Sequence, residues 1–333
     1  MLGQRARVGV RLGVGTLIYF HCANAYATSA SAFPPAPETP FWVPVYRILP
    51  LKRRPLYSAF ISITGIDSSE IPLDLVAYPD FAALFSRSID MRRLRPIDSD
   101  AALVSPADGR ILHLARNVGP DRRITVKNTS YSLAELVAAS TASRAGGLNA
   151  AADEAPWNAA VVYLAPRNYH RFHSPCDLIP KRLYHHTGET LYSVSPIMLE
   201  RVPGLLHRNE RVIMHADLAE SRVTDALVEK EPLSPTAKGG WMAYVAVGAT
   251  CVGSIEWNDA PALQTNNHAS SSGKDNRVQQ VIVPESARQR LAKGDEIGAF
   301  NFGSTIVLVW SGLPGEFCVS EGDAIRVGEA IFK

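Results

Sequence analysis

The segment Phe302-Gly-Ser-Thr-Ile-Val-Leu-Val-Trp310 ends in a run of apolar residues with the length and the β-branched content of a buried strand. Gly303 and Ser304 precede that run. A glycine followed by a serine between strands is commonly an ordinary turn or bulge. It also has a chemical alternative, because glycine permits close approach at its carbonyl and the next hydroxyl can attack that carbon, converting an amide into an ester. The sequence around the junction leaves both interpretations open.

Outward from this segment, most of the chain is patterned as short strands separated by Gly and Pro. The expected strands include Arg110–Leu114, Ala159–Leu164, Trp241–Val247, Gln280–Val283 and Thr305–Trp310. Fewer helices are expected. The spacing of apolar residues predicts one over Asp80–Ile89, and the capping box Ser132-Leu-Ala-Glu135 predicts another over Leu133–Ala139. The sequence therefore predicts an α+β fold, with a β-rich core of short, mostly antiparallel strands and with helices concentrated in the N-terminal half.

Composition excludes several classes of protein. The chain has 333 residues, of which 46% are apolar and 20% charged, so neither wholesale disorder nor a polytopic membrane protein fits. Lys and Arg number 34 against 32 for Asp and Glu, which gives no global positive charge that would indicate a nucleic-acid partner. The four cysteines form no CxxC pair, so free thiols are expected rather than a zinc ribbon or a disulfide framework.

The N-terminal part divides into a targeting segment and a helical region. Residues 1–37 contain no Asp or Glu, and three early arginines precede a short apolar run. A Pro-rich linker, Phe33–Pro40, follows. We expect residues 1–40 to be a targeting segment or membrane anchor with its linker, 41–100 a helical, membrane-facing region and 101–333 a β-rich catalytic domain. Ala138–Pro156 and Gln264–Arg277 are expected to be surface loops.

Three polar groups could carry chemistry. Asp108 lies in Ser105-Pro-Ala-Asp-Gly-Arg110, which by itself is compatible with a plain Asp-Gly hairpin turn. His170 and His173 follow a buried strand, and their spacing would place them on one face of a helical turn or along one cleft. Zinc binding is the obvious alternative role for this pair. The sequence lacks the glutamate of an HExxH motif and a clear third ligand for the metal.

Asp108, His173 and Ser304 together suggest a catalytic triad. A conventional hydrolase would carry GxSxG around its serine, whereas the sequence here is Phe302-Gly-Ser-Thr-Ile306. The serine is therefore expected to attack its own chain.

The joint pattern resembles the phosphatidylserine decarboxylases of proteobacteria and mitochondria, from about Arg53 to Phe332. The segments that carry the resemblance are Arg53-Arg-Pro-Leu-Tyr57, Ser105-Pro-Ala-Asp-Gly-Arg110, Val126-Lys127 with Tyr131-Ser-Leu133, Tyr163-Leu-Ala-Pro166 with Tyr169-His-Arg-Phe-His-Ser-Pro175, Asn209-Glu-Arg-Val212, Val247-Gly-Ala-Thr250 with Val252-Gly-Ser-Ile255, and Phe302-Gly-Ser-Thr305. Two positions depart from the family pattern, since Cys251 and Ser195 stand where Asn is usual.

The resemblance implies self-cleavage between Gly303 and Ser304, giving a β chain of residues 1–303 and an α chain of residues 304–333. Ser304 would become a covalent pyruvoyl group, with no metal and no pyridoxal phosphate required. His173 would deprotonate Ser304, and Asp108 would orient and stabilise the imidazolium.

The pyruvoyl group would decarboxylate phosphatidylserine to phosphatidylethanolamine by Schiff-base chemistry. His170 is expected to assist this second stage by positioning the substrate or reprotonating the carbon, with a pKa suited to proton transfer near neutral pH. The α and β chains would remain together as a heterodimer, and further dimerisation is left open.

The lipid substrate implies contact with an anionic membrane. Two basic clusters, Lys52-Arg-Arg54 and Arg92-Arg93 with Arg95, are suited to such a surface or are simply solvated charges. Likeness to the mitochondrial members favours the mitochondrial inner membrane, with the secretory pathway as the alternative. A zinc hydrolase using His170 and His173, a non-catalytic phosphatidylserine-binding module and a decarboxylase for another headgroup are the rival functions.

Overall fold

The computed structural model describes residues 53–119, 122–138, 155–188, 194–219, 240–249, 255–263, 265, 278–281, 290–301 and 304–333, with backbone alone at 278–280 and 304. The expected targeting segment, nearly all of both expected loops, Lys52, Cys251, Phe302 and Gly303 lie outside these residues. Among the described cysteines, Cys176 is a buried free thiol and Cys318 an exposed one.

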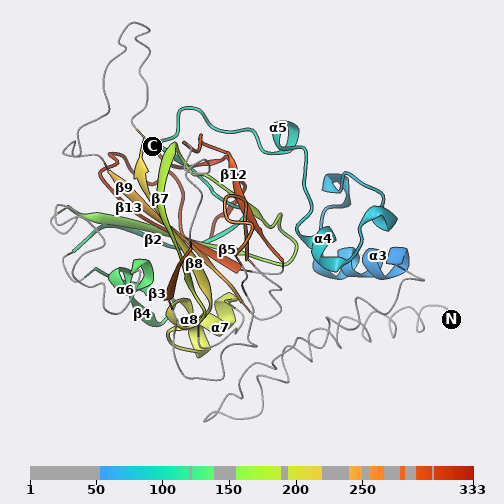
Figure 1. Ribbon diagram of the computed structural model, residues 1–333, viewed down its shortest axis with the longest axis horizontal. Coiled ribbons are helices and arrows are strands. Elements are labelled where there is room, and N and C mark those ends of the chain that lie inside the picture. Colours follow the sequence, from blue (N-terminus) through green and yellow to red (C-terminus); the bar gives the residue numbers. More distant parts are fainter. Residues whose placement is uncertain are drawn as a thin grey trace, which may run out of the picture.

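An antiparallel sheet forms the centre of the described structure (Figure 1). Its strand order is β11-β7-β8-β9-β13-β5-β2-β14, and we call it the large sheet. The strands are β2 Gly109–Val118, β5 Trp157–Leu164, β7 Leu178–His186, β8 Arg211–Leu218, β9 Trp241–Val247, β11 Val278–Val281, β13 Ser304–Ser311 and β14 Ala324–Ile325. Strand β13, which contains the apolar run of the opening segment, pairs with β9 on one side and β5 on the other.

A second sheet, of order β10-β12-β6, packs against one face of the large sheet, and we call it the small sheet. Its strands are β6 Arg171–His173, β10 Ile255–Trp257 and β12 Glu296–Phe300. Phe172 and Phe300 from the small sheet share one hydrophobic cluster with Ile306 and Leu308 of β13. Two short pairs, β1 Leu103–Val104 with β15 Ala330–Phe332 and β3 Arg123–Val126 with β4 Thr129–Ser132, complete the strands.

The other face of the large sheet is covered by helices α6 Leu133–Val137, α7 Pro196–Arg201 and α8 Leu205–Arg208 (Figure 1). Leu136 and Leu205 from these helices lie in one cluster with Val307 and Val309 of β13. Because Ile306 and Leu308 point to the opposite cluster, β13 is buried on both faces, and this explains its unbroken apolar sequence.

The N-terminal helices lie beside the large sheet, at the right of Figure 1. They are α3 Arg53–Thr64, η2 Ser68–Glu70, η3 Leu75–Ala77, α4 Phe81–Phe85 and α5 Met91–Leu94. Asp80 caps α4 by accepting a hydrogen bond from the Ala83 amide. Within the described part of the chain, no helix has both the length and the apolar character required to cross a bilayer.

The fold class agrees with the α+β prediction, including helices that lie mostly in the N-terminal part, and two local expectations need correction. The helix expected over Asp80–Ile89 ends at Phe85, and Ile89 packs instead beside Tyr169. The helical-turn alternative for the two histidines is wrong, since His173 belongs to strand β6.

Candidate active site

Ser304 is the first residue of β13, and its backbone is paired with Leu164 at the end of β5. Strand β12 of the small sheet ends at Phe300, only a few residues earlier in the chain. The Gly303–Ser304 junction therefore belongs to the connection between the two sheets. One neighbour, Thr305, is fully buried, and its hydroxyl has no hydrogen-bond partner among the described residues.

His173 is buried and is held at both ring nitrogens. Its Nδ1 lies 2.9 Å from the carbonyl oxygen of Gly294, which can only accept, so Nδ1 carries the proton. Its Nε2 lies 3.1 Å from the Tyr169 hydroxyl and accepts that hydrogen bond. Burial lowers the pKa of His173, against the opposing effects of the Gly294 carbonyl and of the Glu296 and Asp108 charges. The imidazole is thus neutral near pH 7 and has a basic lone pair on Nε2.

Tyr169 is a contact that the sequence-based site did not include, although it lies in the same motif as the histidines. Its ring stacks on His173 with centroids 5.7 Å apart and an interplanar angle of 30°. Burial is the main cause that raises the pKa of Tyr169, so its hydroxyl remains protonated.

His170 is completely buried beside the ring of Phe85, with centroids 3.8 Å apart. Its Nδ1 donates to the Asn168 carbonyl at 2.8 Å, while its Nε2 has no partner among the described residues. Burial lowers the pKa of His170 to about 3. The expectation of a pKa near neutrality is therefore wrong for this state, because the ring is taken out of water without a carboxylate partner.

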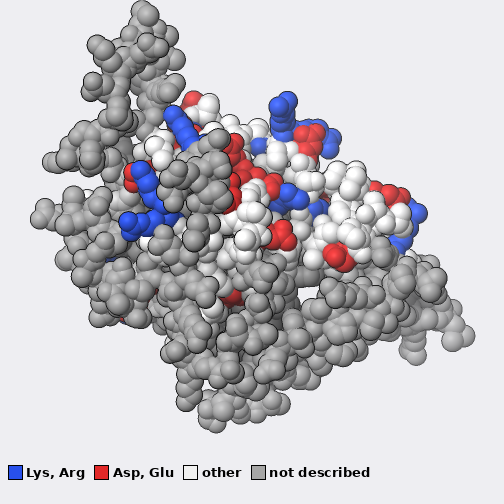
Figure 2. Space-filling model, in the orientation of Figure 1, with Lys and Arg blue, Asp and Glu red and all other residues white. Residues whose placement is uncertain are grey.

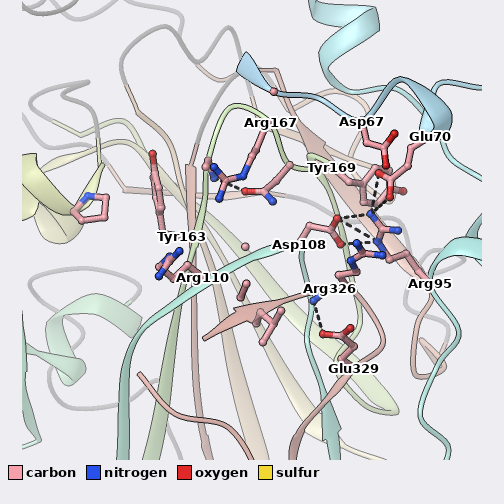
Figure 3. A pocket seen from close by; sticks show the side chains of 17 residues that line it. Asp67, Glu70, Arg95, Asp108, Arg110, Tyr163, Arg167, Tyr169, Arg326 and Glu329 are labelled. Carbon is pink, nitrogen blue, oxygen red and sulfur yellow. Dashed lines mark hydrogen bonds and ion pairs between the residues drawn. The ribbon is translucent and has the colours of Figure 1, made fainter. Parts of the chain in front are cut away.

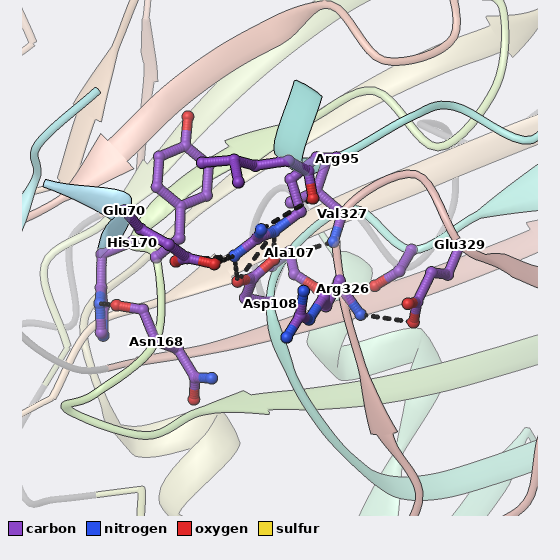
Figure 4. Close-up of polar contacts among 12 residues, drawn as sticks. Glu70, Arg95, Ala107, Asp108, Asn168, His170, Arg326, Val327 and Glu329 are labelled. Atoms are coloured by element: carbon purple, nitrogen blue, oxygen red, sulfur yellow. Dashed lines mark hydrogen bonds and ion pairs between the residues drawn. The ribbon is translucent and has the colours of Figure 1, made fainter. Parts of the chain in front are cut away.

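Asp108 is buried directly before β2, and its carboxylate faces Arg95 (Figure 4). The Arg95 Nη2 lies 2.6 Å from Asp108 Oδ2, and the Val327 amide donates to Oδ1 at 2.9 Å. The two ring nitrogens of His173 bond elsewhere, so Asp108 reaches His173 through its charge rather than through a hydrogen bond. This buried ion pair rules out a plain hairpin turn as the whole explanation of the Asp-Gly sequence.

Arg95 corrects one sequence-based expectation. Its side chain is only 2% exposed and also pairs with Glu70 at 2.9 Å, so it does not belong to a membrane-facing surface as Arg92 and Arg93 could. Burial disfavours its charge, but its bonds to Asp108 and Glu70 outweigh this effect and raise the pKa of Arg95. In the sequence, Arg92, Arg93 and Arg95 form one basic cluster, and nothing in it indicates that Arg95 is buried.

A pocket of about 530 Å³ opens beside these groups (Figure 3). Tyr163 and Ala165, which flank the Ser304 partner Leu164, line it together with Asp108 and Tyr169. The pocket therefore lies at the end of the large sheet where β13 begins. The described residues contain no group of three or more His, Cys, Asp and Glu side chains arranged to hold a metal ion.

Comparison with known proteins agrees with this geometry. The family model described as phosphatidylserine decarboxylase matches residues 81–333. The mitochondrial phosphatidylserine decarboxylase proenzyme of Cricetulus griseus is 30% identical over 310 residues, which covers 88% of this chain and 68% of that protein. The corresponding proenzyme of the bacterium Idiomarina loihiensis is 34% identical over 258 residues, covering 76% of this chain and 75% of the relative. The matched region contains the start of β13, both histidines and most of the residues that line the pocket, and the chain belongs to the phosphatidylserine decarboxylase family.

Proposed function

We propose that the chain is a proenzyme that cuts itself between Gly303 and Ser304 and then converts phosphatidylserine to phosphatidylethanolamine and CO₂. The observation that carries the proposal is a serine at the head of a buried central strand, within the region matched by the family model. The rival functions, a zinc hydrolase or a non-catalytic binding module, find no support in the comparisons.

In the first stage, the Ser304 hydroxyl attacks the Gly303 carbonyl carbon, and the peptide bond is replaced by an ester. His173 Nε2 takes the serine proton, directly or through the Tyr169 hydroxyl bound to it. Elimination across the serine Cα–Cβ bond then releases the Gly303 carboxylate and leaves a dehydroalanine. Water hydrolyses this residue to a pyruvoyl group and ammonia. The Asp108 charge favours the imidazolium that forms at His173.

In the second stage, the pyruvoyl group supplies an electron sink for the carbon that loses CO₂. Residue 304 fits such a group, because its backbone is fixed by pairing with Leu164 and the buried hydroxyl of the neighbouring Thr305 has no partner within the described part of the chain. Burial lowers the pKa of His170 to about 3, so its ring stays neutral and is a weak base. Its Nε2 has no partner among the described residues, and we assign to it the positioning of the substrate in this stage.

Intact-mass analysis tests the proposal. The wild type should yield two chains, one of which begins at residue 304 and reacts with hydroxylamine, while Ser304→Ala should remain one chain. A single unmodified wild-type chain that leaves phosphatidylserine unchanged would refute the proposal.

The two histidines should separate the two stages. His170→Ala is expected to cleave but to decarboxylate poorly, whereas His173→Ala should not cleave. The opposite result would mean that the two roles are exchanged.

We also propose that the N-terminal helices contact the anionic membrane that carries the substrate. Ile63, Leu73 and Val76 are exposed apolar side chains at 44%, 55% and 57%. Figure 2 shows blue side chains projecting where Figure 1 places α5, whose last turn carries Arg92 and Arg93. Acidic side chains lie beside them, so the apolar residues must supply part of the binding.

Liposome flotation measures this contact. Neutralising Arg92 and Arg93 should weaken binding to phosphatidylserine-containing vesicles, and unchanged flotation would count against the surface. The relatives named as mitochondrial support a mitochondrial location, within which we propose the inner membrane.

A further inference from the structure

Arginine side chains occur in two parts of the pocket lining. Arg95 and Arg326 lie beside Asp108, and two further arginines lie apart from them (Figure 3). Glu70 and Asp108 lie on one side, and Arg95 pairs with both of them. Arg110 and Arg167 lie on the other side, near Tyr163. Arg110 is the cross-strand partner of Tyr163, and the charge of Arg167 acts on the Tyr163 hydroxyl.

The two arginines of the basic side retain donors for a ligand. Arg110 uses one nitrogen, Nη1, to donate to the Gly322 carbonyl at 2.8 Å. Among the described residues, the Arg167 guanidinium has no hydrogen bond or ion pair, and both side chains are exposed. The carboxylates opposite them are committed to Arg95, so they do not neutralise these guanidinium groups. Paired guanidinium donors are the side chains best suited to an anionic phosphate.

The position of the basic side relative to Ser304 also fits a phosphate. Arg110, Tyr163 and Thr305 lie in one cross-strand row, so two strand spacings, about 10 Å in all, separate Arg110 from Thr305. In phosphatidylserine, phosphorus is four bonds from the amine nitrogen, a span of about 5 Å at roughly 1.5 Å per bond. An amine that reaches residue 304 therefore brings its phosphate within the range of these arginine side chains.

We propose that Arg110 and Arg167 bind the phosphodiester of the substrate headgroup, opposite the acidic side formed by Glu70 and Asp108. This inference rests on the proposed function, and it assigns the headgroup a direction in the pocket. The phosphate contacts hold the substrate equally before and during decarboxylation, so they affect substrate affinity more than turnover.

The test uses phosphatidylserine with short acyl chains below its micelle concentration, so that vesicle binding plays no part. Arg110→Gln and Arg167→Gln should each raise KM about tenfold, and the double variant about a hundredfold, with kcat changed much less. All variants should cleave normally. Arg116→Gln is the matched control, because Arg116 is an exposed arginine further along β2 and outside the pocket. Arg92→Gln with Arg93→Gln controls for charge on the proposed membrane surface.

Competition distinguishes the headgroup from free phosphate. Glycerophosphoserine should compete with the lipid in the wild type and compete less in the double variant, whereas ethanolamine, which lacks phosphate, should inhibit all variants equally. Unchanged KM in variants that cleave and turn over the lipid would overturn the inference alone. Dependence of activity on inorganic phosphate, with no competition from glycerophosphoserine, would also overturn it. A wild type that cleaves but leaves the lipid unchanged would instead refute the proposed function.

Discussion

The orientation of His173 depends on two groups that no triad pattern contains. The Gly294 carbonyl fixes the proton on Nδ1, and the Tyr169 hydroxyl occupies Nε2. Asp108, which the triad pattern assigns to orientation, is engaged by Arg95 and the Val327 amide. In a conventional triad, one carboxylate both orients the histidine and stabilises its charged form. Here a backbone carbonyl and a tyrosine orient the ring, and the carboxylate acts only through its charge.

Tyr169→Phe should slow self-cleavage by about tenfold to a hundredfold, because the hydroxyl that connects His173 Nε2 to its surroundings is lost. The Nδ1 contact remains, so the variant should fold normally. The conversion of precursor into two chains can be followed by gel electrophoresis after synthesis in a cell-free system. Cleavage at the wild-type rate or faster would show that Tyr169 merely covers the base.

Sequence patterns predicted the residues with recognisable chemistry and missed those that tune them. Asp108, His170 and His173 were selected from short motifs. In the structure the charge of Asp108 acts on His173, and Asp108 lines the pocket together with the residues that flank Leu164, the partner of Ser304. Glu70 and Arg95 are 25 positions apart and become partners only through the tertiary fold. The pKa of His170 likewise depends on burial, which its neighbours in sequence do not reveal.

At the level of elements, strand β12, which precedes the proposed cleavage junction, packs very closely against its neighbours. A side chain at Gly298 would collide with the backbone carbonyl of Glu256 in β10 and would lie 2.7 Å from the Phe172 ring. The absence of a side chain at this position lets the three strands of the small sheet and the aromatic layer approach each other.

Gly298→Ala should lower the free energy of unfolding by about 1–3 kcal/mol, because neither the carbonyl nor the packed ring can give way cheaply. It should also slow cleavage by displacing the chain that leads from β12 to Ser304. Chemical denaturation of the uncut form and the cleavage time course measure the two effects. Wild-type values for both would disprove the proposed coupling.

Strands were predicted more reliably than helices, for a physical reason. The central strands are buried on both faces, so β5, β9 and β13 carry apolar runs that local reading detects. Helices α7 and α8 have six and four residues, too short for a helical period to emerge. The helix predicted over Asp80–Ile89 was too long. Ile89 was counted as part of the apolar face of that helix, whereas it packs against Tyr169 and Val327.

At the scale of the whole molecule, buried histidines make the fold sensitive to acid. Burial lowers the pKa of a group of them, and for His186 as for His170 the value falls to about 3. The group comprises His170, His173, His186, His207 and His215. Below a pH of about 6.5, the pKa of histidine in the unfolded chain, these histidines bind protons in the unfolded chain but remain neutral in the folded chain. Stability is therefore complete above that pH and falls as pH decreases towards 3.

Urea unfolding of the uncut Ser304→Ala chain should give a lower free energy at pH 5.5 than at pH 7.5, with each fully shifted histidine contributing on the order of 1 kcal/mol. His186→Gln, in which an amide can still donate to the Ala138 carbonyl, should reduce this difference. An equal pH dependence in both chains would contradict the assignment.

The central position of β13 in the large sheet has a consequence for the order of folding and cleavage. Its two neighbours, β5 and β9, pair with it along nearly its whole length, so the chain that would begin at residue 304 after the proposed cleavage supplies a central strand of the large sheet. Folding must then precede the cut. If residues 1–303 and 304–333 were synthesised as two separate polypeptides, each would expose strand edges with unpaired backbone groups. Such chains would aggregate more readily than they would assemble.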